Sequence, residues 1–277
     1  MPKLLNAFTT NNKIQKMTNA ISRRKFAQTT MLAMAGATFS VQSFAAKPDG
    51  NKIKAIAFDG FAIFDARPIF KKVSELFPVK GKQVVEIWKA KQFGYQWLRA
   101  LGSNYKNFLA VTQDALEFAA KVCDINLSKD DLKEIMNEYE KITAWPDVLP
   151  ALQQLRNEKL KLVFLTNMTE EMIKAGIHNS NTENYFDHII STDRRQTYKP
   201  SPLAYQMGID TIKLRKEEVL FVAFAAWDMA GAKWFGYPTF WVNRLHSRAE
   251  KLDVEPDGAG ENLIDLVDFV RQINSER

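Results

Sequence analysis

Short apolar runs alternate with helix-like segments along most of this chain, and that alternation limits the folds open to it. The first run covers residues 53–58 and is followed at once by Asp59 and Gly60. Later runs, with helical segments between and after them, cover residues 160–165, 188–191, 219–223 and 239–242. Strands that alternate with helices form a mostly parallel sheet with helices on both faces. We therefore expect a doubly wound α/β core.

A long segment after the first run breaks this alternation. It is rich in Lys, Gln, Leu, Trp and Phe at helical spacing, which predicts a helical cap inserted after the first strand. One helix face in it is expected to carry Val84, Trp88, Tyr95 and Leu98. The predicted division is 1–45 for a leader, 46–65 and 146–277 for the core, and 66–145 for the cap.

The leader has the pattern of a twin-arginine export signal. Arg23 and Arg24 precede Phe26, no charge follows until after Ala46, and small residues stand at Ser43 and Ala45. We expect passage through the twin-arginine machinery and a periplasmic location. An uncleaved membrane anchor facing the periplasm is the alternative, because the uncharged run is about long enough to span a bilayer.

The net charge of the chain does not indicate a nucleic-acid partner. The formal charge is +6, but the leader carries basic residues and no acidic ones, and the remainder has equal numbers of each. A neutral remainder predicts no basic binding face. Cys123 is the single cysteine in the sequence, so no intramolecular disulfide can form.

Polar residues follow the predicted strands at the edge where such sheets bind ligands. A carboxylate such as Asp59 can act as a covalent nucleophile, and a cation such as Lys199 can keep it ionised. Thr166 could donate a hydrogen bond to a substrate or carboxylate oxygen. Asp228 could fix Lys199 and help to activate water. Plainer interpretations stay open, since an aspartate often caps a turn, a threonine often caps a helix, and a lysine is usually solvated.

The order of four motifs is similar to that of the haloacid dehalogenase superfamily. The motifs are Phe58-Asp59, Leu165-Thr166-Asn167, Tyr198-Lys199-Pro200 and Trp227-Asp228. Within that superfamily, the segment from Trp88 to Phe118 resembles the cap helices of the L-2-haloacid dehalogenase (type II) branch. The resemblance covers nearly all of residues 53–245.

This resemblance implies a mechanism for cleaving the carbon–halogen bond of a short (S)-2-haloalkanoic acid. Asp59 would displace the halide and form an ester, which water then hydrolyses at the carboxyl carbon of Asp59. Lys199 would keep Asp59 ionised, Thr166 would help to bind the substrate carboxylate, and Asp228 would support Lys199 and the water. The family needs no metal or other cofactor, and a homodimer through the cap helices would suit it.

Five further residues are candidates for substrate binding. Lys89 stands where the family has an arginine that binds substrate and halide, and it lacks the planar fork of that side chain. Phe61, Trp88 and Asn167 each adjoin a site position, and Tyr205 matches a tyrosine near the family's site. An apolar pocket between cap and core could be lined by Phe58, Phe61, Phe64, Trp88, Trp97 and Trp227, with core packing as the alternative for at least half of them.

The chain also departs from the family pattern around the nucleophile. The loop after Asp59 is one residue shorter and lacks a Gly-Thr step, and Ala223-Phe224-Ala225 replaces Ser-Ser-Asn, whose amide positions the water. These losses leave open a catalytically impaired homologue that binds a small carboxylate. A phosphatase fits less well, because Phe61 stands where a second carboxylate is needed and residues 223–225 offer no magnesium ligands.

Overall fold

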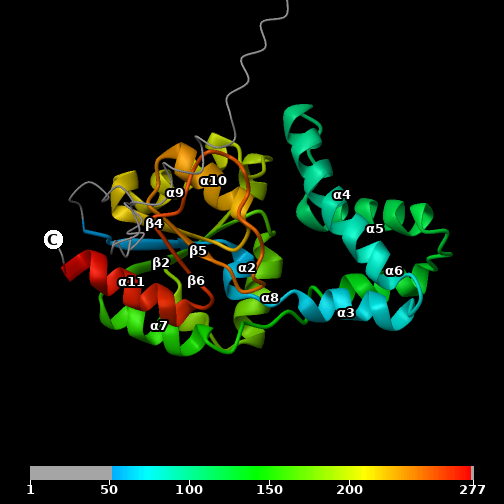
Figure 1. Cartoon of the computed structure of the whole chain (residues 1–277), viewed down its shortest axis with the longest axis horizontal. Helices are drawn as coiled ribbons and strands as arrows, with labels where there is room; N and C mark the ends of the chain where they lie inside the picture. Colours follow the sequence, from blue (N-terminus) through cyan, green and yellow to red (C-terminus); the bar gives the residue numbers. More distant parts are fainter. Residues whose placement is uncertain (1–51, 276–277) are drawn as a thin grey trace, which may run out of the picture. The chain divides into compact units, whose positions relative to one another are not determined.

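The computed structural model describes residues 52–275, so the predicted leader lies outside the described residues (Figure 1). Within the described range the sheet has six parallel strands in the order β3-β2-β1-β4-β5-β6. The strands are β1 (Ala55–Phe58), β2 (Lys161–Thr166), β3 (His188–Ser191), β4 (Val219–Ala223), β5 (Thr239–Val242) and β6 (Gly258–Gly260). No helix of this part of the chain is both long enough and apolar enough to span a membrane.

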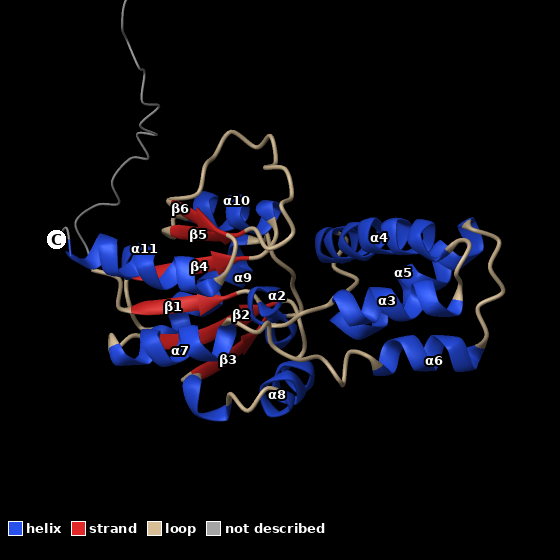
Figure 2. Ribbon diagram, turned by 60° about the horizontal axis from the view of Figure 1, so that its bottom comes forward, coloured by secondary structure: helices blue, strands red, loops and turns tan. Residues whose placement is uncertain are grey.

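Side chains of each strand alternate between two apolar layers, as the period of a strand requires. On β1, Ile56 and Phe58 belong to one hydrophobic cluster, and Ala55 and Ala57 belong to the other. The first cluster includes residues from α7 (Val148–Asn157), α8 (Glu170–Asn179) and α11 (Leu263–Ser275), and the second includes residues from α9 (Pro202–Ile212) and α10 (Ala226–Phe235). Figure 2 shows the sheet between these helices, and the predicted doubly wound fold is confirmed.

Helices fill the segment between β1 and β2. After the short α2 (Gly60–Ile63) come α3 (Arg67–Leu76), α4 (Gly81–Leu101), α5 (Phe108–Val122) and α6 (Lys129–Asn137). The segment that leaves the core and the segment that returns to it run side by side. The backbone N–H of Asp65 donates to the Thr143 carbonyl at 2.9 Å, and the backbone N–H of Trp145 donates to the Ile63 carbonyl at 3.0 Å. We call α3–α6 the cap.

The buried face of α4 differs from the predicted one. It runs through Val84 and Trp88 and continues with Gln92 and Gln96, each one helical turn further on. The placement of Leu98 on this face is wrong, because its side chain is 67% exposed. Leu98 follows Trp88 by ten residues. At 3.6 residues per turn, its side chain therefore lies about 80° from that of Trp88 around the helix axis. Two glutamines therefore continue the buried face, where Gln92 donates to Thr112 on α5 and Gln96 accepts from Asn167 after β2.

A buried ion pair fixes the re-entry point of the chain. The Arg244 guanidinium donates to both carboxylate oxygens of Asp147, at 2.7 and 2.9 Å, and to the Ala62 carbonyl at 3.0 Å. Asp147 also accepts the Leu263 N–H at 2.7 Å. The Arg244 side chain is only 4% exposed. The Asp147–Arg244 pair thus joins α2, the segment after β5 and the start of α11.

We expect Asp147→Ala to lower the free energy of unfolding by about 3 kcal/mol, because it leaves the Arg244 charge buried without its partner. Burial alone would raise the pKa of Asp147, but Arg244 lowers it below the ordinary value. The stabilisation is therefore present above the ordinary aspartate pKa and is lost as pH falls through the lowered value. Urea denaturation at neutral and acidic pH measures both effects.

The matched control is Glu75→Ala, which breaks the exposed Lys71–Glu75 pair on α3. We expect a change below about 0.5 kcal/mol there, as for other exposed pairs. If both variants lost the same free energy of unfolding, the Asp147–Arg244 pair would contribute no more than an exposed pair, which would contradict this prediction.

Candidate active site

Asp59 lies at the carboxyl end of β1, where it caps α2. Its Oδ2 accepts the Phe61 N–H at 3.1 Å, so the plain capping role considered for this residue is present. The loop can pass this close to β2 only because residue 60 is glycine. A Cβ at Gly60 would lie 2.8 Å from Thr166 Oγ1 and 2.5 Å from Met168 Sδ. Thr166 therefore packs against Gly60, the residue next to Asp59.

Lys199 joins two carboxylates, one directly after β1 and one in the first turn of α10. Its Nζ lies 2.8 Å from Asp59 Oδ1 and 2.5 Å from Asp228 Oδ2. The lysine is 0% exposed, which is unlike the solvated lysine of the plain interpretation. The structure thus brings Asp59, Lys199 and Asp228 together, as the sequence predicts.

Burial and the neighbouring charges shift the pKa values of Lys199 and Asp228. Burial would lower the pKa of Lys199, but the charges and hydrogen bonds of Asp228 and Asp59 outweigh it and raise that pKa. Burial raises the pKa of Asp228; Lys199 opposes this rise, and Asp59 adds to it. Lys199 therefore stays charged, and Asp228 takes up a proton more readily than an exposed aspartate does.

Tyr205 lies behind Asp228 and does not line the cavity described below. Its hydroxyl donates to Asp228 Oδ1 at 2.7 Å, and its side chain is fully buried. A Cβ at Gly231 would lie 2.5 Å from this hydroxyl, so glycine is what lets Tyr205 reach α10. The sequence placed Tyr205 among the substrate-binding residues, whereas its contacts make it a partner of Asp228.

Thr166 and Asn167 occupy the end of β2 with different partners. Thr166 Oγ1 accepts the Met168 N–H at 3.1 Å and lies against Gly60. Asn167 Oδ1 accepts the Lys199 N–H at 2.9 Å, and Asn167 Nδ2 donates to Gln96 Oε1 at 3.3 Å. Asn167 therefore connects the cap helix α4 to the backbone of the loop that carries Lys199.

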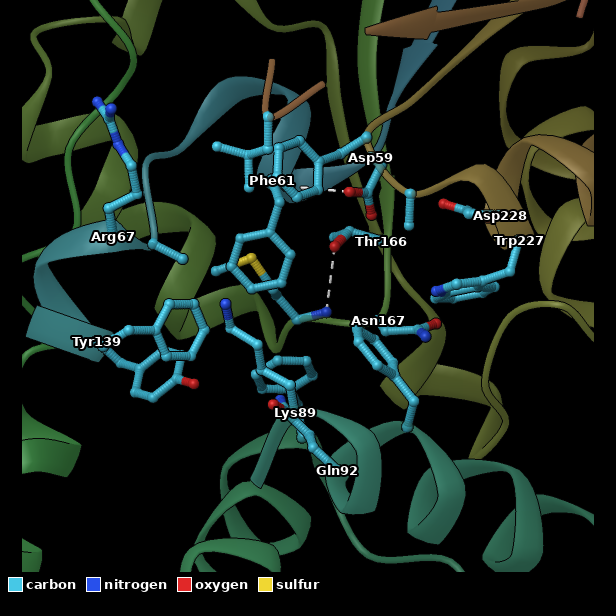
Figure 3. A pocket seen from close by; sticks show the side chains of 18 of the residues that line it. Asp59, Phe61, Arg67, Lys89, Gln92, Tyr139, Thr166, Asn167, Trp227 and Asp228 are labelled. Atoms are coloured by element: carbon cyan, nitrogen blue, oxygen red, sulfur yellow. Dashed lines mark hydrogen bonds between the residues drawn. The ribbon is translucent and has the colours of Figure 1, made fainter. Parts of the chain in front are cut away.

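A cavity of about 170 Å³ opens in front of Asp59 (Figure 3). Its wall includes Asp59, Thr166, Asn167 and Asp228 from the core, and Lys89 and Gln92 from α4. Lys199 does not line it and lies behind Asp59. Within the described part of the chain, no three His, Cys, Asp or Glu side chains converge as a metal ion would require.

Lys89 brings a cation from the cap into this cavity (Figure 3). Its Nζ lies 3.9 Å from the centre of the Phe70 ring, and no carboxylate of residues 52–275 pairs with it. Desolvation lowers its pKa, and Glu86 opposes that shift. The neighbouring Trp88 points elsewhere: it is fully buried and donates its indole N–H to the Thr112 carbonyl at 2.9 Å. Lys89 thus lines the cavity as predicted, and Trp88 packs inside the cap.

Aromatic side chains supply most of the remaining wall. Of the predicted aromatic set, Phe61 and Trp227 line the cavity, while Phe58 and Phe64 are fully buried in the core. Sequence reasoning missed several lining residues, namely Arg67, Phe70, Phe93, Phe108, Tyr139, Trp145 and Leu245. It noted Phe224 only as a replacement in a motif. The position of Phe224 directly after a strand is the signal that could have placed it here.

Comparisons with known proteins agree with this fold. A family model of haloacid dehalogenase-like hydrolases matches residues 6–236. Haloacetate dehalogenase H-2 from Moraxella sp. (strain B) is 35% identical over 208 residues, which cover 75% of this chain and 93% of that protein. The (S)-2-haloacid dehalogenase from Pseudomonas sp. (strain YL) is 34% identical over 218 residues, covering 78% and 94%.

A solved structure is also similar. The L-2-haloacid dehalogenase from Xanthobacter autotrophicus, with chloropropionic acid covalently bound, superposes with a TM-score of 0.73. The two chains are 28% identical, and the match covers 79% of this chain and 98% of that one. The family model and the identities together establish that this chain belongs to the haloacid dehalogenase-like hydrolases.

Proposed function

We propose that this protein hydrolyses the carbon–halogen bond of a 2-haloacid through an ester on Asp59. The observation that carries the proposal is the position of Asp59, which faces a mostly apolar cavity while Lys199 holds it from behind. Relatives of this chain are named as dehalogenases of haloacetate and of (S)-2-haloacids, which supports the same bond as the target.

The two oxygens of Asp59 have different partners, which assigns the attacking atom. Oδ1 accepts from Lys199, whereas Oδ2 accepts the single Phe61 N–H. Oδ2 attacks the halogen-bearing carbon in line, the carbon–halogen bond breaks, and the halide leaves with the electron pair. The Lys199 ammonium keeps the carboxylate ionised and oriented for this step. The low polarity of the wall strengthens these electrostatic interactions.

The substrate carboxylate finds its counter-charge at Lys89. That ammonium points into the cavity and has no carboxylate partner in the described residues, so a bound anion would supply one. Thr166, which packs against Gly60 and lines the cavity on the core side, offers a hydroxyl. An ammonium on one side and a nucleophile on the other match a molecule whose acid group adjoins the reacting carbon.

Water completes the reaction by attacking the carboxyl carbon of Asp59. The ester bond breaks, the product is a 2-hydroxy acid of inverted configuration, and one proton is released for each halide. Asp228 lines the cavity and is held by Lys199 and Tyr205, so it is the carboxylate best placed to support the water. Ala225 also lines the cavity and offers no polar side chain.

This apolar residue favours a second candidate function. The protein would form the ester but hydrolyse it slowly, and so act mainly as a binder of small carboxylates. The two candidates differ in which species accumulates. Intact-protein mass spectrometry during incubation with (S)-2-chloropropionate, together with a halide assay, separates continued turnover from a trapped adduct.

Export and assembly stay predictions. The twin-arginine leader lies outside the described residues, and we propose from its sequence alone that the protein works in the periplasm. The homodimer through the cap helices rests on the family resemblance.

We expect Asp59→Asn to reduce halide release from (S)-2-chloropropionate by at least about 1000-fold, because the nucleophile is lost. The adduct should also disappear from the mass spectrum. The control is Asp130→Asn, which changes an exposed aspartate on α6 and should release halide at the wild-type rate. Normal halide release by Asp59→Asn would rule out the ester mechanism.

We expect Tyr205→Phe to move the acidic limb of the kcat/KM profile to higher pH. The Tyr205 hydrogen bond lowers the pKa of Asp228, so its removal raises that pKa further. Asp228 must be ionised to hold Lys199, and activity is therefore lost earlier on acidification. The control is Tyr237→Phe, since that hydroxyl donates to the Tyr205 carbonyl and not to Asp228. An unchanged limb in Tyr205→Phe would contradict this role.

We expect Ala225→Asn to raise kcat by about tenfold and to reduce the amount of accumulated ester. Ala225 is the N-cap of α10 and makes no side-chain capping bond, and asparagine is favoured at that position. The new amide would face the cavity, where it can position the water. Rapid-quench measurements of ester and halide test this. A rise in thermal stability without any change in kcat would mean that the amide serves only as a cap.

A further inference from the structure

Two tyrosines connect the cap to the segment that precedes Lys199. Tyr105, in the loop between α4 and α5, donates its hydroxyl to Asp193 Oδ1 at 2.6 Å. Tyr198 donates its hydroxyl in the opposite direction, to the Lys106 carbonyl at 2.7 Å. The centres of the two tyrosine rings lie 5.1 Å apart. Cap and core each supply one donor and one acceptor, and we call Tyr105, Lys106, Asp193 and Tyr198 the clasp.

The hydrogen bonds of the clasp are shielded from water. Tyr198 is 1% exposed, and Tyr105 is half-buried. Burial raises the pKa of both phenols, so both hydroxyls keep the proton that they donate. The Tyr105–Asp193 distance is within the ~2.5–2.7 Å range of a hydroxyl that donates to a carboxylate, a bond roughly twice as strong as a neutral one. This bond is therefore the main contact of the clasp.

The cap half of the clasp is fixed to both of its neighbouring helices. The Asp114 carboxylate on α5 accepts from Arg99 Nη2 on α4 at 3.1 Å and from Lys106 Nζ at 2.8 Å. Arg99 also donates to the Asn104 carbonyl in the loop at 3.3 Å. The loop between α4 and α5 is thus held to the two helices, and the clasp carries the position of the cap to the core.

The core half of the clasp leads directly to Lys199. Asp193 lies in the short 3-10 helix η2 (Thr192–Arg195), which follows β3. The Gln196 N–H donates to the Asp193 carbonyl at 3.0 Å, so the chain after this helix is held close to it. Tyr198 then precedes Lys199 by one peptide bond. The clasp therefore fixes the backbone on which the ammonium of the site depends.

We propose that Tyr105 is a positioning residue, which acts through the clasp to fix Lys199 and so the carboxylate of Asp59. The inference rests on the proposed function. Neither Tyr105 nor Asp193 lines the cavity, so neither would touch the substrate. A misplacement of about 1 Å at a reacting group can cost ~100-fold in rate. Loss of the Tyr105 hydroxyl should therefore slow the attack by Asp59 without weakening binding of the substrate carboxylate at Lys89.

We expect Tyr105→Phe to lower kcat for (S)-2-chloropropionate about tenfold and to leave KM within about twofold of the wild-type value. Rapid-quench measurements should place the loss in formation of the ester. Hydrogen exchange of residues 192–199 should become faster, because the backbone hydrogen bonds of this segment open more often. The control is Tyr95→Phe, another half-buried tyrosine of the cap, whose ring packs on Phe118 and which should change none of these quantities.

A double-mutant cycle tests whether Tyr105 acts through Asp193. We expect Asp193→Ala to lower kcat about as much as Tyr105→Phe does, and the double variant to lose no more than either single variant. Asp193→Asn keeps an oxygen that can accept the hydroxyl and should retain most of the wild-type kcat. Losses of kcat that add in the double variant would contradict the pairing.

The outcomes separate this inference from the proposed function. Normal turnover by the wild-type protein, with unchanged kcat or unchanged hydrogen exchange in Tyr105→Phe, would overturn the inference and leave the proposed function intact. A higher KM with a wild-type kcat would also overturn it, because the clasp would then serve only to hold the cap over the substrate. Failure of the wild-type protein to release halide or to form an adduct would overturn the proposed function itself.

Discussion

The buried ammonium of Lys199 is the constraint on which the rest of the site depends. A lysine that is 0% exposed must be surrounded by compensating groups, since an unpaired buried charge is costly. Asp59 supplies one from the end of β1 and Asp228 another from the first turn of α10, and the Phe221 ring lies 5.0 Å from Nζ. Glycines at 60 and 231 allow the close approaches that this arrangement requires. The geometry of the nucleophile is therefore a consequence of burying one lysine.

The site combines an intact nucleophile with an apolar wall. The residues around Asp59 keep their polar contacts, whereas Phe224 and Ala225 line the cavity with apolar side chains. An apolar surrounding weakens competition from water and strengthens the Asp59–Lys199 interaction. It also offers no donor that could position the hydrolytic water of the proposed mechanism. In that mechanism, the same apolar residues favour formation of the ester and slow its hydrolysis.

Much of the fold and the triad could be predicted, because both follow from strand ends in a parallel sheet. Asp59 directly follows β1, Lys199 lies in the loop after β3, and Asp228 lies in the first turn of α10 after β4, and the parallel sheet brings all three to one edge. The wall could not be predicted in this way, since Trp145 and Phe224 come from segments far apart in sequence. The helical periodicity marked Trp88 as buried but did not show that it packs on α5 and not in the cavity. The strand β6 was missed because Gly258–Gly260 lacks an apolar pattern.

The cap and the nucleophile are coupled through Asn167. The Asn167 side chain donates from Nδ2 to Gln96 on α4, and its Oδ1 accepts the backbone N–H of Lys199. The indole of Trp97, the next residue on α4, donates to the Lys199 carbonyl at 3.3 Å. A shift of α4 therefore disturbs both backbone groups of the residue that holds Asp59. Because α4 also carries Lys89, the helix that would contact the substrate carboxylate in the proposed mechanism also helps to position Asp59.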